Sequence, residues 1–314
     1  MIGRTAAAWN EILNETKSTG SVHDVIRRKY LKKLSQHTKR NTIIYYSGWL
    51  QKAQLGGEPA VQLGISDTDK NGFMSAIHKM DRSRGLDLIL HTPGGDMAAT
   101  ESIVDYLRAM FGTDIRAIVP QLAMSGGTIM AISCNQILMG KGSSIGPIDP
   151  QFGSIAAVNL LQEFDKARKE ISDDPSAALL WQPILQQIQP GFISHCRNAM
   201  DWSHEIASRF LSTNMFLNDD DGPDKAKQII SHLTDSETTR HHGRHISYEE
   251  ASKIFGDKFT RLEDDQRLQD LVLTVHHAAM ITLQSSGCYK IIENDQGRAF
   301  MQMVAMQVLQ QPNS

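Results

Sequence analysis

Residues 85–153 constrain the fold of this chain more than any other stretch, because two glycine turns each join an apolar run to a helix. The first turn follows Leu86–His91 and reads Thr-Pro-Gly-Gly at 92–95. The second follows Ile115–Val119 and reads Ser-Gly-Gly at 125–127. Helical spacing of apolar residues follows the first turn, and a short apolar helix is expected after the second. Since strand–helix–strand crossovers are right-handed, the stretch predicts a parallel α/β layer.

The two turns carry groups that suit chemistry on a carbonyl. Helix N-termini present unpaired N–H groups and the positive end of the helix dipole, and glycine lets the backbone approach a ligand closely. Ser125 begins the second helix, so we predict it to be a nucleophile. We predict the N–H groups of Gly126 and of Gly94 or Gly95 to be the oxyanion donors. In the alternative interpretation, Ser125 only caps its helix and the glycines only form tight turns.

Composition and charge exclude several other classes of protein. The chain has 314 residues, of which 40% are hydrophobic and 21% charged, so a sizeable core is expected. Its net charge of −3 argues against a general nucleic-acid binder. Its three cysteines lie far apart, which fits neither a disulfide framework nor a zinc site and favours a reducing compartment. With no apolar run of 18 residues and no signal-peptide pattern, we expect a cytoplasmic protein without a transmembrane segment.

The motifs themselves resemble a known group of enzymes. The pair HTPGG at 91–95 and AMSGG at 123–127 looks like the ClpP/SppA group of serine peptidases, a branch of the crotonase-like fold. The stretch SSIGPIDPQFG at 143–153 resembles more narrowly the serine dehydrogenase proteinases, and so does the histidine-containing segment at 242–251. The resemblance covers residues 41–260.

This resemblance implies both a fold and an activity. The fold is an α/β, ClpP/crotonase-like repeated β-β-α spiral with helical N- and C-terminal extensions. The activity is that of a serine endopeptidase, a hydrolase that acts on a peptide or protein substrate and needs no cofactor and no metal. Proteins of this fold usually assemble as trimers, stacked trimers or rings, so a homo-oligomer is also implied.

Three regions of a single domain are expected. Residues 1–40 form a helical N-terminal arm, residues 41–160 the catalytic core, and residues 161–314 a mainly helical C-terminal part. Within the arm, helices are expected over Ala6–Thr16 and over the basic stretch His23–Ser35. We expect the basic helix to dock on its own or a neighbouring subunit rather than on nucleic acid, because charge runs usually need no partner.

The loop Ile145–Gln151 sets one limit on the resemblance. ClpP has its catalytic histidine at about this position, and this chain has none there, so a ClpP-type triad does not carry over. Two prolines flank Asp149 and stiffen the backbone. Asp149 and Gln151 are predicted either to line the site or orient the base, or else to be part of a structural loop.

The general base has three candidates, because a serine hydroxyl needs a neighbouring base to become a nucleophile. His242 ranks first and His245 second, since both lie in the segment that resembles the family's histidine motif. Lys166 ranks third, because SppA-like enzymes use a lysine whose charge is suppressed by desolvation. The alternative for each of them is an exposed surface residue. Elsewhere, His91 is expected to be a hydrogen-bonded structural residue, and His276 a surface or interface residue.

The sequence leaves two other functions open, one for an enzyme of the same fold and one from a different class. A crotonase-like acyl-CoA enzyme would use the same paired N–H groups to stabilise a thioester enolate, but it needs no serine on the turn. A catalytically silent, oligomeric peptide-binding scaffold would need no general base at all. Ser125 between Met124 and Gly126 favours the peptidase over both.

Overall fold

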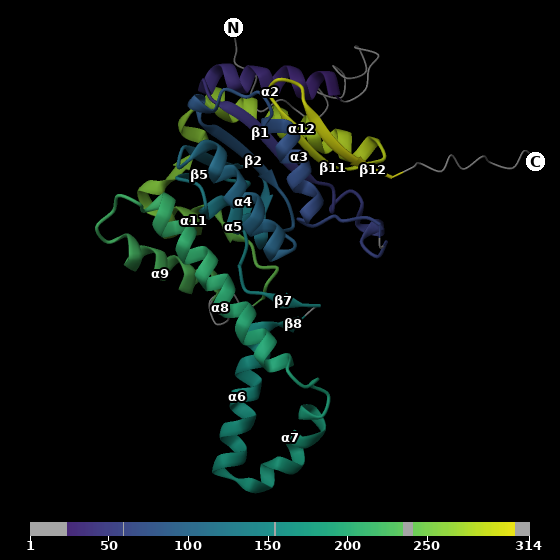
Figure 1. Cartoon of the computed structure of the whole chain (residues 1–314), viewed down its shortest axis with the longest axis vertical. Coiled ribbons are helices and arrows are strands. Elements are labelled where there is room, and N and C mark those ends of the chain that lie inside the picture. Colours follow the sequence, from purple (N-terminus) through teal and green to yellow (C-terminus); the bar gives the residue numbers. More distant parts are fainter. Residues whose placement is uncertain (1–23, 59, 154, 235–240, 305–314) are drawn as a thin grey trace, which may run out of the picture.

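The fold is built on a seven-stranded, mostly parallel sheet (Figure 1). The computed structural model describes residues 24–58, 60–153, 155–234 and 241–304. The strand order is β10-β5-β3-β2-β1-β11-β12, in which β11 is antiparallel to both its neighbours and the other neighbours pair in parallel. The strands are β1 (Asn41–Ser47), β2 (Leu86–His91), β3 (Ile115–Val119), β5 (Gln136–Met139), β10 (Phe259–Arg261), β11 (Cys288–Asn294) and β12 (Ala299–Met303). The chain is therefore a mixed α/β protein, as the sequence predicted.

Helices cover both faces of this sheet. Side chains alternate along a strand, so Ile43 and Tyr45 of β1 join one core, whereas Ile44 and Tyr46 join another. The first core is shared with α3 (Asp67–Ile77), α4 (Met97–Phe111) and α5 (Gly126–Ile132), and the second with α2 (Asp24–Thr38) and α12 (Gln266–Ser285). All residues of β1 and β2 are buried. Burial on both faces explains why the parallel strands have continuous apolar sequences.

A second, smaller sheet lies beside the glycine turns. It contains β4 (Leu122–Ala123), β6 (Ser144–Ile145) and β9 (Ile246–Ser247). β4 pairs with β6 in parallel, and β9 pairs with β6 antiparallel. This pairing brings β9, from the C-terminal part of the chain, next to β6, where the loop Ile145–Gln151 begins. A separate hairpin contains β7 (Gln151–Phe152) and β8 (Ile155–Ala156).

The helices after the hairpin form an arm and then return to the core. α6 (Ala157–Asp173) and α7 (Ala178–Leu185) extend away from the sheet, and α8 (Phe192–Phe210) packs along α6 on its way back (Figure 1). Two more helices, α9 (Gly222–Thr234) and α11 (Tyr248–Phe255), follow it. None of the helices in the described ranges is long and apolar enough to cross a membrane.

The basic helix of the predicted N-terminal arm is α2, which packs on α12. Arg27 is completely buried and forms an ion pair with Glu293 of β11, and Arg28 binds the same carboxylate at 2.6 Å. This helix therefore docks on its own chain through two of its basic residues. The helix expected over Ala6–Thr16 lies outside the described residues.

Strands β11 and β12 are two long elements that the sequence pattern did not predict. Charged residues usually argue against a buried strand, and β11 contains both Lys290 and Glu293, which are fully buried. Each has an oppositely charged partner: Lys290 binds Asp69, and Glu293 binds Arg27. The C-terminal part thus adds three strands, β10, β11 and β12, to the central sheet.

Candidate active site

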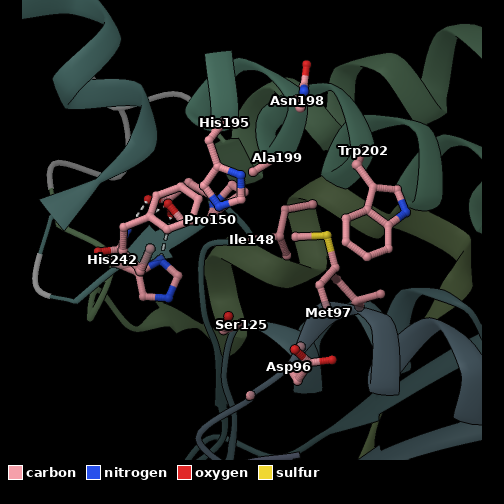
Figure 2. A pocket seen from close by; sticks show the side chains of 16 residues that line it. Asp96, Met97, Ser125, Ile148, Pro150, His195, Asn198, Ala199, Trp202 and His242 are labelled. Carbon is pink, nitrogen blue, oxygen red and sulfur yellow. Dashed lines mark hydrogen bonds and ion pairs between the residues drawn. The ribbon is translucent and has the colours of Figure 1, made fainter. Parts of the chain in front are cut away.

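A pocket of about 430 Å³ opens where the two glycine turns meet (Figure 2). Its walls come from both turns, the loop 148–152, helix α8 and the segment after residue 240. Six of the predicted site residues line it, namely Ser125, His242, Asp149, Gln151, Gly95 and Gly126. One side is apolar and consists of Met97, Ile129, Ile148, Ala199 and Trp202.

Ser125 has a strained backbone at the start of α5. Its φ of 52° and ψ of −115° lie in a region that L-residues rarely occupy. Strain of this kind is concentrated at functional sites, and a serine on a sharp strand-to-helix turn is the arrangement in which some hydrolases expose their nucleophile. Although Ser125 is the N-cap residue, its side chain forms no capping hydrogen bond. The hydroxyl is therefore not used to cap the helix and lies in the pocket.

Two backbone N–H groups lie beside Ser125 without a protein acceptor among the described residues. They belong to Gly95 and Gly126, whereas the N–H of Gly94 donates to Thr92 Oγ1 at 3.2 Å. The nitrogen of Gly95 is 3.4 Å from the position that a Cβ on Gly126 would occupy. The two turns thus present adjacent donors, and of the two alternatives left by the sequence, Gly95 has the available N–H group.

Close approach of the backbones explains why glycine is required in the first turn. Gly94 has a φ of 91°, and a Cβ there would lie 2.7 Å from the Cβ of Ser125. Gly95 has a φ of 156°, and a Cβ there would lie 2.1 Å from the nitrogen of Ile65. A side chain on Gly94 would push the two turns apart, and one on Gly95 would push the first turn away from Ile65.

Asp149 and His242 form a hydrogen-bonded pair at the edge of the pocket. The Nδ1 of His242 is 2.8 Å from Oδ1 of Asp149, and Gln151 donates to Oδ2 at 2.7 Å. An ionised carboxylate only accepts, so Nδ1 carries the proton and Nε2 of the neutral ring is an acceptor. Nε2 has no hydrogen-bond partner in the part of the chain that is described. In Figure 2 the ring lies at the left of the pocket and Ser125 at its base.

Pairing between distant segments holds His242 in this position. The segment that contains it leads into β9, which pairs with β6 just before Asp149. Arg244 also binds the Glu250 carboxylate of α11, with both N–O distances at 3.1 Å. On the other side, Ser203 of α8 donates to the carbonyl of Ile148 at 2.9 Å. Both members of the Asp149–His242 pair are therefore positioned by tertiary contacts.

The other two predicted bases lie outside the pocket. Lys166 is on α6, its side chain is 66% exposed, and it forms an i,i+4 ion pair with Glu170 at 3.9 Å. His245 is exposed and does not line the pocket. An exposed lysine has no burial to suppress its charge, so the geometry does not provide the environment that the SppA-type prediction for Lys166 requires.

Helix α8 contributes pocket residues that were not among the site residues predicted from the sequence. His195, Asn198 and Trp202 all line the pocket (Figure 2). Their spacing places them on one face of a helix, but that pattern alone does not distinguish a pocket wall from a core. The ring of His195 lies 4.7 Å from the ring of Phe152, measured between centroids.

Two buried histidines differ from expectation. His91 lies on the face of β2 that packs in the second core, opposite the face that packs in the first core. Its ring contacts Trp49, Tyr46 and His276 there. Neither of its ring nitrogens has a hydrogen-bond partner among the described residues, so the hydrogen-bonded role predicted for it is wrong. His276 is buried rather than exposed, and its Nδ1 is 3.0 Å from the hydroxyl of Tyr46.

Within the described ranges, no three His, Cys, Asp or Glu side chains are grouped as metal ligands would be. The pocket itself brings together a hydroxyl, an imidazole paired with a carboxylate, and two adjacent N–H donors. These are the parts that acyl transfer to a serine uses.

Comparison with known proteins agrees with this geometry. The model of the family described as ClpP-like SDH-type serine proteinase matches residues 15–256. The uncharacterized protein MJ0137 of Methanocaldococcus jannaschii is 30% identical over 240 residues, which are 76% of this chain and 75% of that protein. The uncharacterized protein MJ1495 of the same organism is 30% identical over 170 residues, 54% of this chain and 51% of that one.

The family match covers both glycine turns and reaches beyond His242, so it includes all six predicted residues that line the pocket. It also agrees with the resemblance seen in the sequence motifs. The chain therefore belongs to the family of ClpP-like SDH-type serine proteinases.

Proposed function

We propose that this protein is a serine endopeptidase that hydrolyses peptide bonds through an acyl-enzyme on Ser125. The observation that carries the proposal is the Asp149–His242 pair, with its 2.8 Å hydrogen bond, at the same pocket as the strained Ser125. In this proposal His242 is the general base and Asp149 holds its ring in the required tautomer, with Gln151 donating to the second carboxylate oxygen.

The reaction follows from these assignments. The Ser125 hydroxyl attacks the scissile carbonyl carbon while its proton moves to Nε2 of His242. The negative oxygen of the tetrahedral intermediate accepts hydrogen bonds from the N–H groups of Gly95 and Gly126. The imidazolium then gives its proton to the leaving amine as the C–N bond breaks. Water, deprotonated by the same histidine, hydrolyses the ester and restores the Ser125 hydroxyl.

Two broader proposals accompany this one. The repeated β-β-α spiral is supported by parallel pairing at two levels, since β3 pairs with β5 and the short strands that follow them, β4 and β6, also pair. A trimer-based or ring-shaped homo-oligomer is supported by exposed apolar side chains on α7, in the arm formed by α6 and α7. Leu179 and Leu180 there are both 77% exposed.

The acyl-CoA alternative lacks a specific observation in its favour. It would use the Gly95 and Gly126 N–H groups, but it would leave the Asp149–His242 pair and the strained Ser125 unexplained. The scaffold alternative is the one that remains if the serine proves unreactive.

Labelling with a fluorophosphonate probe, read by intact mass, tests the proposal directly. We expect one adduct on the wild-type protein and none on Ser125→Ala, because only a hydroxyl activated by a base attacks the probe at an appreciable rate. Ser176→Ala, which removes an exposed serine outside the pocket, is the matched control and should label like the wild type. An unlabelled wild type, or equal labelling of Ser125→Ala, would reject Ser125 as an activated nucleophile.

The apolar side of the pocket predicts the side chain that the enzyme prefers next to the cleaved bond. Trp202→Ala should lower kcat/KM for a leucyl ester by about 10-fold relative to the wild type, because a large apolar contact is lost. An alanyl ester does not reach this wall, so its kcat/KM should change by less than about 3-fold. Parallel rate measurements with both esters check this, and an equal loss for the two would contradict the assignment of this wall to the substrate side chain.

A further inference from the structure

A buried ion pair lies beneath the first glycine turn. Lys290 of β11 and Asp69 of α3 are both completely buried, and Nζ of the lysine is 2.9 Å from each carboxylate oxygen. The hydroxyl of Tyr45 donates to the same carboxylate at 2.7 Å, and the backbone N–H of Ser66 donates to it at 2.9 Å. Neither charged residue lines the pocket, so the pair has no direct part in the proposed chemistry.

The third contact of Lys290 connects the pair to the turn. Nζ donates to the carbonyl oxygen of Gly64 at 2.7 Å. The next residue, Ile65, bonds to both sides of Gly95: its N–H donates to the Gly94 carbonyl at 2.7 Å, and its carbonyl accepts from the Asp96 N–H at 2.9 Å. The backbone at Gly64 is also close, since a Cβ there would lie 3.0 Å from the Gly94 oxygen.

This bonding pattern sets the direction of the Gly95 N–H group. Within one planar trans peptide the C=O and the N–H point in opposite directions. The Gly94 carbonyl shares its peptide with the Gly95 N–H and accepts from Ile65, so this N–H faces the other way, toward Gly126. The position of Ile65 therefore determines the position of this donor.

A buried ion pair is costly to form, because both charges lose their water, and it is often no more stabilising than apolar residues of the same volume. Stability alone is thus a weak reason for this pair. The geometry of the pair offers a second reason for its presence. The Lys290 ammonium group has three fixed acceptors and so holds the Gly64 carbonyl at a defined place relative to α3 and β11.

We propose that Lys290, paired with Asp69, is a positioning residue for the oxyanion hole, which it holds in register through Gly64 and Ile65. This inference rests on the proposed function and assigns a role to two residues that do not touch the substrate. Loss of the pair should move the Gly95 donor and weaken binding of the oxyanion, while the binding of the intact substrate should stay as it is.

The variant that tests this is Lys290→Met combined with Asp69→Asn, which removes both charges and keeps an acceptor for Tyr45 and Ser66. With p-nitrophenyl butyrate, we expect kcat to fall about 10- to 100-fold and KM to change by less than about 2-fold. The inhibition constant of acetyl-leucine boronic acid, whose serine adduct is tetrahedral, should rise by the same factor as kcat/KM falls. A purely structural role would not separate the boronate from the substrate in this way.

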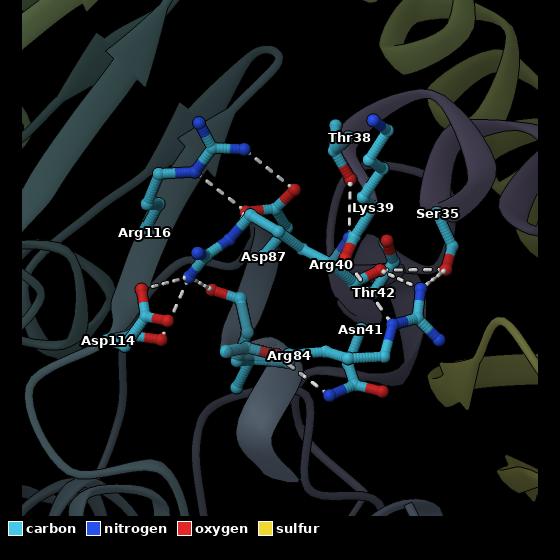
Figure 3. A network of polar contacts seen from close by, with 12 residues as sticks. Ser35, Thr38, Lys39, Arg40, Asn41, Thr42, Arg84, Asp87, Asp114 and Arg116 are labelled. Carbon is cyan, nitrogen blue, oxygen red and sulfur yellow. Dashed lines mark hydrogen bonds and ion pairs between the residues drawn. The ribbon is translucent and has the colours of Figure 1, made fainter. Parts of the chain in front are cut away.

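A polar network at the far end of β2 provides the matched control (Figure 3). There Arg116 binds the buried Asp87 through two hydrogen bonds of 2.8 and 2.9 Å, and Arg40 binds the same carboxylate at 2.8 Å. Arg116→Met removes a bidentate ion pair from Asp87 of β2, the strand that leads to the first glycine turn. Asp87 is at the end of β2 that lies far from this turn. Its kcat and boronate affinity should stay within about 2-fold of the wild type, whatever stability it loses.

Gly64→Ala gives a second test that leaves the ion pair intact. Its methyl group would press on the Gly94 oxygen at 3.0 Å and on the Gly95 Cα at 3.2 Å. It should therefore lower kcat and boronate affinity together, as is expected of the double variant. If the double variant fails to fold, Gly64→Ala still tests whether the position of Gly64 controls the oxyanion hole. A wild-type kcat together with a wild-type boronate affinity, in Gly64→Ala or in a folded double variant, would overturn the positioning role. If the wild type itself were not acylated at Ser125, the proposed function would fail instead, so the two failures are distinguishable.

Discussion

His242→Ala is expected to lower kcat by about four to six orders of magnitude, with a much smaller change in KM. The reason is that Nε2 of His242 is the acceptor proposed for the Ser125 proton, and its partner Asp149 is 2.8 Å from the other ring nitrogen. Alanine removes the acceptor and leaves the glycine donors in place, so residual activity from the oxyanion hole should remain. Steady-state hydrolysis of p-nitrophenyl butyrate measures the effect.

The two other candidate bases provide the controls for this experiment. His245→Ala and Lys166→Ala should each keep kcat within about 3-fold of the wild type, because both side chains are exposed and neither lines the pocket. A collapse of kcat in Lys166→Ala, with normal activity in His242→Ala, would replace the proposed mechanism by a serine–lysine one. Full activity in all three variants would remove the need for any of them as a base.

Acid is expected to destabilise the fold through the histidines of the second core. Burial lowers the pKa of His91 to about 3, and burial also lowers the pKa of its neighbour His276. Below the usual histidine pKa of about 6.5, the unfolded chain takes up a proton that the folded chain does not, so stability falls as the pH falls from about 6.5 toward 3. For His91 alone, the free energy of unfolding should drop by about 3 kcal/mol between pH 7 and pH 4.

Urea unfolding at the two pH values, with and without His91→Leu, isolates this contribution. Leucine has a similar volume and no proton to bind, and it leaves no hydrogen bond unmade, because neither nitrogen of His91 has a partner among the described residues. The variant should lose less stability than the wild type on acidification. Tyr46 and Trp49 also pack on the ring, but they carry no positive charge that would change this sign. Identical pH dependence in the two proteins would contradict the assignment.

Local chemistry is what made much of the site predictable. Ser125, Gly94, Gly95 and Gly126 stand out because a turn that needs positive φ and close backbone approach restricts the residue type at each position. The strands β1, β2, β3 and β5 were also predictable, since burial on both faces gives them continuous apolar sequences. By contrast, β11 was missed because Lys290 and Glu293 are acceptable in a buried strand only when partners from α3 and α2 lie beside them.

The sequence by itself determined the two glycine turns, the parallel α/β layer that contains them, and the serine that begins the second helix. Each of these depends on residues close together in the chain, where conformational preference and periodicity act. Tertiary structure alone decided which histidine lies beside Asp149 and which of two glycines has an available N–H group. Those outcomes depend on the pairing of β9 with β6 and on the bonds from Ile65 to the first turn. Contacts between such distant segments follow from the packing of the whole core, and no local pattern encodes them.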